Sequence, residues 1–170
     1  VFAPNHLSSE LQKLGDIPGV QACVILSTCN RSEIYAVIDA DNPQEVLSQY
    51  LADTHKISRQ EIDSYLVYFE TNAALEHVCN VACGLDSLVL GEPQILGQLK
   101  DAYHIAKQAK TLDKKLEKLF QHAFSTAKKV RTDTQIGSSP VSIAYCAVKL
   151  SEKIFTDLSE QTVLLIGAGE

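Results

Sequence analysis

The sequence of 170 residues contains no methionine, even at its first position. It also lacks any apolar run approaching the roughly 18 residues of a membrane helix, and no signal peptide opens it, so we expect no membrane partner. Basic residues are few, since 15 Lys and Arg stand against 21 Asp and Glu and the formal net charge is −6. This balance argues against a general nucleic-acid binder, because affinity for phosphates comes from Lys and Arg. With 45% hydrophobic residues the chain can bury a core, which argues against disorder.

The two ends of the sequence indicate a fragment of a longer protein. Methionine is missing at the start, and the sequence stops at Gly167-Ala168-Gly169-Glu170, in the middle of a recognisable turn. The length fits one domain, or one domain and a piece of a second.

Paired cysteine motifs are absent as well. The five cysteines are an odd number without a CxxC pair, which does not suit the disulfide framework of a small secreted domain. We therefore expect a reducing compartment, the cytoplasm or a plastid stroma. Four of the five lie in apolar or helical runs and are expected in the core, namely Cys23, Cys79, Cys83 and Cys146.

The first half of the chain predicts an α+β unit. Apolar periodicity, prolines and glycines indicate a helix, two strands, a helix and a third strand, at residues 9–14, 20–26, 33–38, 42–52 and 65–70. This order matches a ferredoxin-like α/β sandwich whose first strand is missing or displaced.

The second half predicts a helical segment followed by one strand. Helices are expected over residues 73–83, 93–110, 113–131 and 139–155, and a buried strand over 161–166 that ends in Gly-Ala-Gly. We expect this last strand to be the first of a Rossmann-type domain. The chain therefore divides into residues 1–138, 139–160 and 161–170.

Charge is distributed unevenly along the chain. Residues 1–100 hold 5 basic and 13 acidic residues, a net charge of −8. Residues 104–131 have a net charge of +6, with Asp113 and Glu117 against Lys107, Lys110, Lys114, Lys115, Lys118, Lys128, Lys129 and Arg131. Most such runs are solvated helix faces. The alternative is a contact strip for a polyanion.

Cys29 is the candidate nucleophile. It follows a predicted strand directly, in a polar turn where a substrate can reach it, and Arg31 stands two residues later. A nearby guanidinium favours the thiolate, which is the nucleophilic form. Arg31 also offers a planar fork suited to a carboxylate, although an ordinary surface ion pair is the alternative.

A second segment, residues 84–98, breaks one predicted helix at Gly84 and starts the next at Pro93. Glu92 and Gln94 then lie near the positive end of that helix. Gly91 and Gly97 allow the close backbone approach that suits a small ligand. A capped connection between two helices is the alternative interpretation.

The two segments together resemble the glutamyl-tRNA reductase family. Residues 27–33, STCNRSE, resemble that family's STCNRTE signature, with Ser32 in place of Thr. Residues 84–98, GLDSLVLGEPQILGQ, resemble its GLDSMVLGEPQILGQ segment, with Leu88 in place of Met. The terminal VLLIGAGE is similar to the first strand and turn of its NADPH-binding domain. The resemblance covers the chain from about residue 20 to its end.

This resemblance implies an NADPH-dependent oxidoreductase that reduces glutamyl-tRNA(Glu) to glutamate-1-semialdehyde, the entry compound of the five-carbon route to tetrapyrroles, porphyrins and haem. Cys29 aligns with the family's nucleophile, which forms a thioester with glutamate. A thioester can accept hydride, whereas a carboxylate cannot. His77 matches a family histidine important for activity, and we expect it to assist proton transfer or the leaving group. Without the resemblance, a surface or hydrogen-bonded core histidine would be favoured.

The resemblance also implies the residues that hold the substrate and the cofactor. In the glutamate pocket we expect Arg31 to hold the side-chain carboxylate, and Glu92, with Ser87 and Gln98, to hold the ammonium. The full set of matching pocket positions is Thr28, Asn30, Arg31, Ser87, Glu92, Pro93, Gln94 and Gln98. NADPH would contact Gly167, Ala168, Gly169 and Glu170. The fingerprint G-x-G-x-x-G is cut after its second glycine, so this site is incomplete and we expect no hydride transfer from the chain alone. No spacing suggests a metal site.

On this basis residues 1–138 would be the catalytic, glutamyl-tRNA-binding domain, 139–160 a connecting helix, and 161–170 the start of the NADPH-binding domain. The resemblance further implies a homodimer formed through a C-terminal domain outside these residues. A downstream aminomutase is the candidate receiver of the aldehyde. The localisation would be the cytoplasm, or the plastid stroma in a plant.

One family motif is missing from the sequence. The family normally begins with a strand that carries GxNHxTAP well upstream of the reactive cysteine, but here Asn5-His6 is followed by Leu-Ser-Ser and lies too close to Cys29. We therefore expect the first strand to be absent. Two other functions remain open: a non-catalytic tRNA- or protein-binding adaptor on the same fold, and a thiol-based redox regulator that uses Cys29. An adaptor would have lost catalysis, and the intact Thr-Cys-Asn-Arg and Gly-Glu-Pro-Gln sequences argue against that loss. A redox regulator leaves residues 84–98 unexplained.

Overall fold

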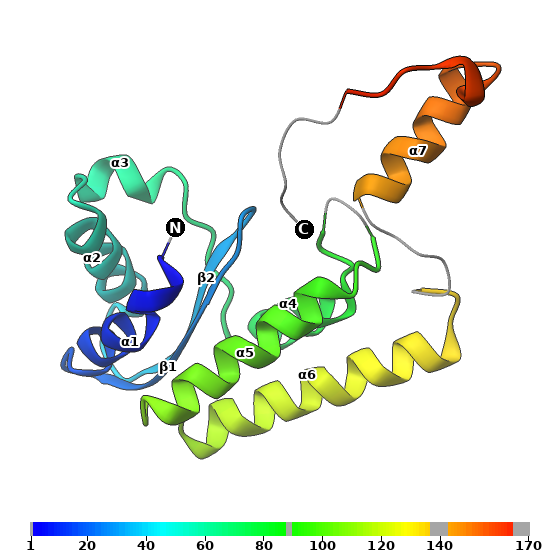
Figure 1. Ribbon diagram of the computed structural model, residues 1–170. Coiled ribbons are helices and arrows are strands. Elements are labelled where there is room, and N and C mark those ends of the chain that lie inside the picture. Colours follow the sequence, from blue (N-terminus) through cyan, green and yellow to red (C-terminus); the bar gives the residue numbers. More distant parts are fainter. Residues whose placement is uncertain (1, 88–89, 137–142, 165–170) are drawn as a thin grey trace.

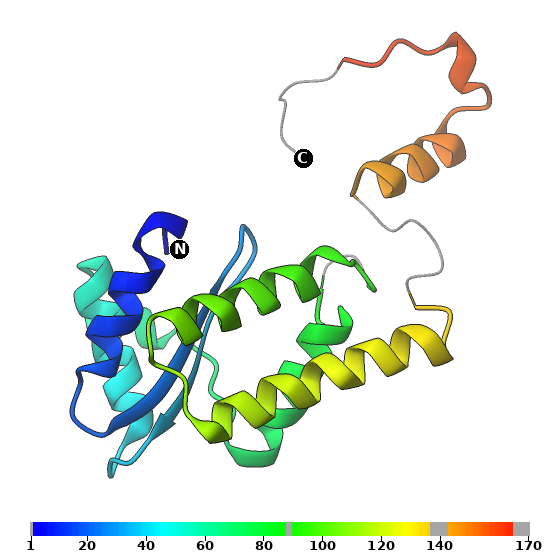
Figure 2. The ribbon, with the colours of Figure 1, turned by 60° about the horizontal axis from the view of Figure 1, so that its bottom comes forward.

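The computed structural model describes residues 2–87, 90–136 and 143–164. Its elements follow one another as η1 (Pro4–His6), α1 (Leu7–Gly15), β1 (Val20–Ser27), β2 (Ser32–Ile38), α2 (Pro43–His55), α3 (Arg59–Asp63), α4 (Thr71–Cys83), α5 (Gln94–Gln108), α6 (Lys114–Asp133), α7 (Ile143–Ile154) and η2 (Leu158–Glu160). The described chain is thus α+β and mostly helical. In the two views α1, α2 and α3 lie on one side of the β-hairpin, and α4, α5 and α6 on the other (Figures 1 and 2).

The hairpin of β1 and β2 positions the polar turn that carries Cys29. The strands are antiparallel, with Val24 opposite Tyr35 and Ser27 opposite Ser32, so the turn of residues 28–31 directly follows the last pair of the ladder. Residues 22–26 of β1 are buried without alternation, because helices cover both faces of the strand. The predicted strands 20–26 and 33–38 are confirmed within one or two residues.

The helices begin and end where local chemistry requires it. Asn42 caps α2 by accepting a hydrogen bond from the amide of Glu45, and Asp113 caps α6 by accepting one from the amide of Leu116. Gly84 ends α4 with a positive φ of 73°. The helices expected over residues 9–14, 42–52, 73–83, 93–110 and 113–131 are all confirmed.

The core joins the hairpin to the helices of the second half. Phe120 of α6 is fully buried and contacts the rings of Tyr35, Tyr103 and Phe124, at centroid distances between 5.3 and 6.0 Å. The same core contains Leu11 and Leu14 of α1, Val78 and Val81 of α4, and Leu99 of α5. These contacts fix α4 and the strand β2 against one another, and both carry site residues.

The third strand expected over residues 65–70 is not formed. These residues follow α3, have no regular secondary structure, and expose the side chains of Tyr65, Val67 and Phe69. Their alternating apolar pattern predicts a strand, but a strand needs a paired neighbour, and among the described residues only β1 and β2 pair. The described sheet therefore has two strands, and the ferredoxin-like sandwich is not seen in it.

The last part of the chain also differs from expectation. A helix does form near residues 139–155, as α7, although its predicted start at 139–142 lies outside the described residues. Of the strand expected over 161–166, residues 161–164 have no regular secondary structure, and the rest lies outside the described residues. Cys146 is exposed rather than in the core, because α7 stands apart from the other helices (Figure 2). The exposed side chains of Val148, Leu150 and Ile154 follow from the same position.

No helix in the described parts of the chain is both long enough and apolar enough to cross a membrane.

Candidate active site

The turn between the two strands presents Cys29 to solvent. The amide of Thr28 donates to the carbonyl of Arg31 at 2.8 Å, which closes the turn. The hydroxyl of Thr28 accepts from the amides of Asn30 and Arg31, at 3.2 and 3.0 Å. Cys29, which lies between Thr28 and Asn30 in the chain, is exposed. Thr28 is expected to bind substrate. In the structure its hydroxyl is hydrogen-bonded within the turn that holds the candidate nucleophile.

Arg31 leaves this turn and bridges two distant segments. Its Nη1 lies 2.7 Å from Oε1 of Glu33 and 3.1 Å from Oδ2 of Asp86, and its Nη2 donates to the carbonyl of Asp86. Burial works to lower the pKa of Arg31, but the charges and hydrogen bonds of the two carboxylates outweigh it and raise the pKa. The guanidinium therefore stays charged, and the two residues that it contacts, Glu33 and Asp86, each carry a carboxylate.

His77 of α4 lies between the same two carboxylates. Its Nε2 is 3.3 Å from Oε1 of Glu33, and its Nδ1 is 3.9 Å from Oδ2 of Asp86. The ring of Phe69 stacks on the imidazole at a centroid distance of 4.3 Å and an interplanar angle of 11°. Only 18% of the His77 side chain is exposed. The imidazole is thus held in one orientation by two carboxylates at its edge and an aromatic ring on its face.

Glu33 is the centre of this arrangement. Besides Arg31 and His77, it accepts a hydrogen bond from the hydroxyl of Tyr35. Burial, and then the charge of Glu33, raise the pKa of that tyrosine well above its usual value. Glu33, His77 and Asp86 also offer three ligand atoms within 4.8 Å of one another, a spacing that suits a cation. In this structure Arg31 supplies the positive charge there.

The segment after α4 is folded back on itself by two glycines. The amide of Gly91 donates to the carbonyl of Gly84 at 2.9 Å, and a Cβ on Gly84 would come within 3.2 Å of Gly91 and of the amide of Glu92. Gly91 thus packs against Gly84 of the chain itself, whereas a Cβ on Gly97 would meet nothing within 4 Å. The approach of a ligand to these two glycines stays a prediction.

The remaining predicted pocket residues lie along this segment and the start of α5. Ser87 and Glu92 are half-buried, and the carbonyl of Glu92 accepts a hydrogen bond from Nη2 of Arg131 at 3.1 Å. Pro93 is the N-cap of α5, and Gln94 and Gln98 are exposed on its first turns. The hydrogen bond between Arg31 and Asp86 ties the segment to the turn of Cys29.

The structure thus unites part of the predicted site and adds residues to it. Arg31 and His77, which are 46 positions apart, meet through Glu33 and Asp86. Sequence reasoning assigned no role to Glu33, Asp86 or Phe69, although the first two stand inside the quoted motifs. The predicted cofactor positions, Gly167, Ala168, Gly169 and Glu170, lie outside the described residues.

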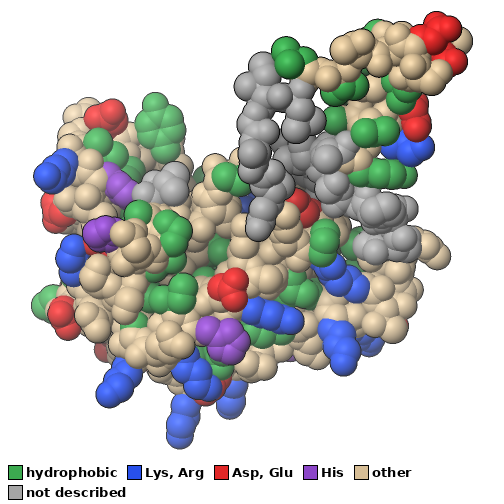
Figure 3. Space-filling view, viewed as in Figure 1, with side chains coloured by type: hydrophobic (Ala, Val, Ile, Leu, Met, Phe, Trp, Pro, Cys, Tyr) green, Lys and Arg blue, Asp and Glu red, His purple; other side chains and the backbone are tan. Residues whose placement is uncertain are grey.

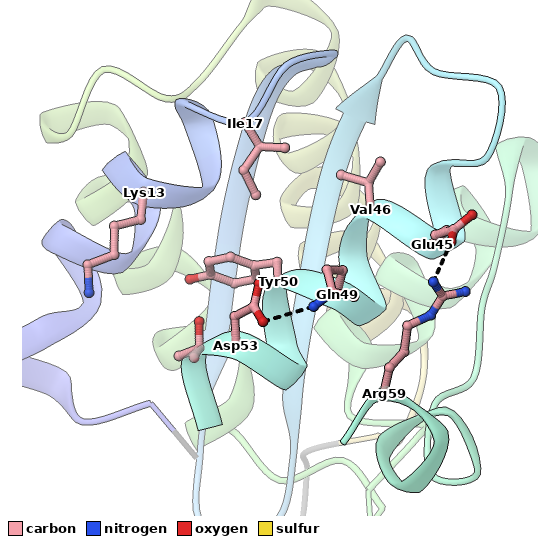
Figure 4. Close-up of a pocket in the computed structure, with 9 residues that line it drawn as sticks. Lys13, Ile17, Glu45, Val46, Gln49, Tyr50, Asp53 and Arg59 are labelled. Atoms are coloured by element: carbon pink, nitrogen blue, oxygen red, sulfur yellow. Dashed lines mark hydrogen bonds and ion pairs between the residues drawn. The ribbon is translucent and has the colours of Figure 1, made fainter. Parts of the chain in front are cut away.

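Two shallow grooves lie on other parts of the surface. One, with a volume of about 630 Å³, lies over α1, α2 and the start of α3 (Figure 4). Its polar side chains are mostly paired, since Gln49 bonds to Asp53 and Arg59 to Glu45. None of the predicted site residues lines it. The other, also about 630 Å³, lies between α5 and α6 and is lined by Lys100, Lys128 and Arg131 among others.

Comparison with known proteins places this chain in a family of enzymes. The sequence model described as "Glutamyl-tRNAGlu reductase, N-terminal domain" matches residues 1–134, so the chain belongs to that family. The match begins at residue 1, earlier than the limit near residue 20 that the motifs indicate.

Individual relatives agree with this assignment. A protein named glutamyl-tRNA reductase from Vesicomyosocius okutanii is 74% identical over 169 residues, and one from Methylococcus capsulatus is 47% identical over the same length. The alignments cover 99% of the chain but 41% and 40% of these relatives, so the chain spans about two fifths of their length. The solved structure of glutamyl-tRNA reductase from Methanopyrus kandleri matches the whole chain, with a TM-score of 0.71 and 32% identity, over 39% of its own length.

Proposed function

We propose that this chain is the part of a glutamyl-tRNA reductase that binds glutamyl-tRNA(Glu) and forms the acyl-enzyme, in the first step of tetrapyrrole biosynthesis. The observation that carries the proposal is the exposed Cys29 in a fixed turn, joined through Arg31 to the cluster of Glu33, His77 and Asp86. The family assignment and the names of the relatives support it.

The acyl transfer uses the residues of the chain itself. The Cys29 sulfur, as its thiolate, attacks the ester carbonyl carbon of the glutamyl group, a C–S bond forms, and the bond from that carbon to the ribose oxygen breaks. The leaving ribose oxygen takes up a proton, and we assign its delivery to His77, whose ring is held by Glu33, Asp86 and Phe69. The glutamyl side-chain carboxylate is held by the guanidinium of Arg31, whose planar fork matches it.

The substrate carboxylate must exchange with a carboxylate of the chain. Arg31 is bound to both Glu33 and Asp86 in this structure, and the two differ in exposure, at 17% and 55% of the side chain. The more exposed Asp86 is the group that the substrate displaces. Glu33 stays in place, because it is also bound to Tyr35 and lies against His77.

NADPH, when bound, would supply hydride to the thioester carbon. Gly167, Ala168, Gly169 and Glu170 are the positions proposed for its contacts. A homodimer and transfer of the aldehyde to an aminomutase remain predictions from the family resemblance.

The test is covalent labelling. The protein is mixed with glutamyl-tRNA carrying radiolabelled glutamate, without NADPH, quenched in acid, and the polypeptide is examined for label. We expect label on the wild type and on Cys146→Ser, which removes the other exposed cysteine, and none on Cys29→Ser. An adaptor would bind the tRNA but carry no label and release no glutamate. A redox regulator would be labelled by oxidants at Cys29 but not by glutamate. Wild-type protein that shows neither label nor Cys29-dependent deacylation contradicts the proposal.

A further inference from the structure

The exposed side of α6 carries lysines near both of its ends. The helix has 20 residues, which corresponds to about 30 Å. At 3.6 residues per turn its exposed lysines fall within a sector of about 140°. They are Lys114, Lys115, Lys118, Lys128 and Lys129, which we call the lysine face.

This surface is narrower than the basic run in the sequence. Lys107 is not part of it, because its Nζ lies 3.1 Å from Oε1 of Glu117 and its charge is compensated. Arg131 is not part of it either, because its guanidinium turns toward the carbonyl of Glu92. Lys110 is exposed but lies in the connection before α6, so five lysines of the run remain on the helix itself.

The lysines of this face are not paired with the carboxylates near them on the helix. Asp133, four residues after Lys129, is exposed in the same sector, but among the described residues it forms no ion pair with a lysine of the face. On solvated helices Glu or Asp three or four residues away compensates each Lys. Here the side chains of the five lysines make no ion pair or hydrogen bond within residues 2–87, 90–136 and 143–164, whereas Lys13 and Lys149 both pair with glutamates three residues away. Glu117 of α6 is committed to Lys107. Uncompensated like charges repel one another, and a bound polyanion relieves that repulsion.

The face begins beside the candidate active site. Arg131, near the C-terminal end of α6, is bonded to the segment that holds Asp86 and Glu92. The groove between α5 and α6 continues from this point, lined by side chains able to donate to phosphate oxygens, namely Lys100, Gln121, Ser125, Lys128, Arg131 and Thr132. In the space-filling view, Lys and Arg side chains gather along the lower side of the molecule, where α5 and α6 run (Figure 3).

We propose that the lysine face and the groove between α5 and α6 bind the phosphodiester backbone of the RNA whose esterified end reaches Cys29. This inference rests on the proposed function, which supplies the RNA. The groove contacts the backbone nearest the site, and Lys114, Lys115 and Lys118 contact it farther away, up to about 30 Å along the helix. Two groups of lysines without ion pairs, one near each end of the helix, suit a sequence-independent polyanion, because phosphate contacts position a nucleic acid without reading its bases.

The experiment uses three double variants that each remove two positive charges. The inner pair is Lys128→Gln with Lys129→Gln, the outer pair is Lys114→Gln with Lys118→Gln, and the control pair is Lys56→Gln with Lys153→Gln, which are exposed elsewhere. Binding of unacylated tRNA(Glu) is measured by fluorescence anisotropy between 50 and 200 mM salt. Circular dichroism and thermal melting establish that each variant is folded.

We expect the inner and outer pairs each to weaken binding about tenfold at low salt, and to reduce the slope of log K against log salt by about 1.4 to 1.8. The control pair changes the slope by much less. Equal effects in all three pairs would show that only the net charge matters and would overturn the assignment of this surface. Wild-type slopes in the inner and outer pairs would overturn it as well. Preference of the face for polyglutamate over tRNA would indicate an acidic protein instead and would also contradict it.

Thioester formation separates this inference from the proposed function. At saturating glutamyl-tRNA the inner and outer pairs should label Cys29 at the wild-type rate, with only the half-saturating concentration raised. If the wild type forms no thioester but the pairs still lose salt-dependent RNA binding, the proposed chemistry fails and the RNA surface stands. If the thioester forms with an unchanged half-saturating concentration in both pairs, the chemistry stands and the surface is wrong.

Discussion

Removal of the Asp86 carboxylate should tighten substrate binding, although Asp86 contacts two candidate site residues. In this structure Oδ2 of Asp86 lies 3.1 Å from Nη1 of Arg31. The Asp86 carboxylate must leave this position when the glutamyl carboxylate binds to Arg31. The variant Asp86→Asn keeps the shape of the side chain and removes its charge. The neutral Asn side chain binds the Arg31 guanidinium more weakly than the Asp86 carboxylate does. The glutamyl carboxylate therefore loses less binding free energy when it displaces that side chain.

The size of the effect follows from exposure. The Asp86 side chain is 55% exposed, so solvent screens its ion pair, and exposed pairs contribute about 0.2 to 1 kcal/mol. Since 1.4 kcal/mol corresponds to tenfold, the half-saturating concentration of glutamyl-tRNA should fall by about 1.5- to 5-fold. Glu33→Gln should act in the opposite direction. Glu33 is 17% exposed and bonds to charged Arg31 and to Tyr35, so the loss should lower the free energy of unfolding by about 2 kcal/mol and weaken substrate binding.

The assay is single-turnover thioester formation at increasing glutamyl-tRNA, together with urea unfolding of each variant. Asp63→Asn is the matched control, because Asp63 is a half-exposed aspartate that pairs with Arg59 away from the site. It should leave the half-saturating concentration unchanged. An increase, or no change, in Asp86→Asn would refute the exchange of carboxylates on Arg31.

Three further predictions follow from the same contacts. Arg31→Lys should raise the half-saturating concentration of glutamyl-tRNA by about tenfold or more, because Lys lacks the planar fork, and unchanged kinetics would rule out the carboxylate role. Phe69→Leu should slow thioester formation by about fivefold and alter its pH profile, because an aromatic contact that orients His77 contributes about 1 kcal/mol. Phe69→Tyr keeps the ring and should retain the rate. Equal rates in the two variants would contradict the positioning role of Phe69. Burial raises the pKa of Cys23 to about 11 from 9.0, so the folded state keeps a proton that the unfolded state loses, and the free energy of unfolding should fall as pH rises from 9 to 11. Urea titrations should show a flatter decline for Cys23→Ala, and iodoacetamide should alkylate native Cys29 but not Cys23.

Most helices could be predicted because their signals are local. The apolar stripe, the caps at Asn42 and Asp113, and the glycine at position 84 each act within one or two turns of their own helix. The segment 65–70 was predicted wrongly because a strand depends on a partner, which local alternation does not report. Cys146 was placed in the core for a similar reason, since an apolar helix face becomes buried only where another element covers it.

The basic run shows the limit of counting charges along a sequence. Residues 104–131 carry a net charge of +6, but two of the cations have local partners. Lys107 pairs with Glu117, and Arg131 donates a hydrogen bond to the carbonyl of Glu92. The ion pairs show that Lys110 and the five lysines of the lysine face have no carboxylate partner among the described residues, and the helix geometry shows that the five lie on one side of α6. The overall charge of −6 thus conceals a basic surface on an acidic chain.

By itself the sequence determined the motif residues, the family they resemble, and the turn that exposes Cys29, because all of these depend on neighbours within a few positions. Only the tertiary structure decided that Arg31 and His77 share Glu33 and Asp86, since α4 packs against α6 and α6 against β2, which brings residues 31, 77 and 86 together. It also decided that Asp86 occupies the guanidinium that the substrate is proposed to use. Contacts between residues some 50 positions apart arise from the burial of a common core, and that core is set by the whole chain rather than by any one motif.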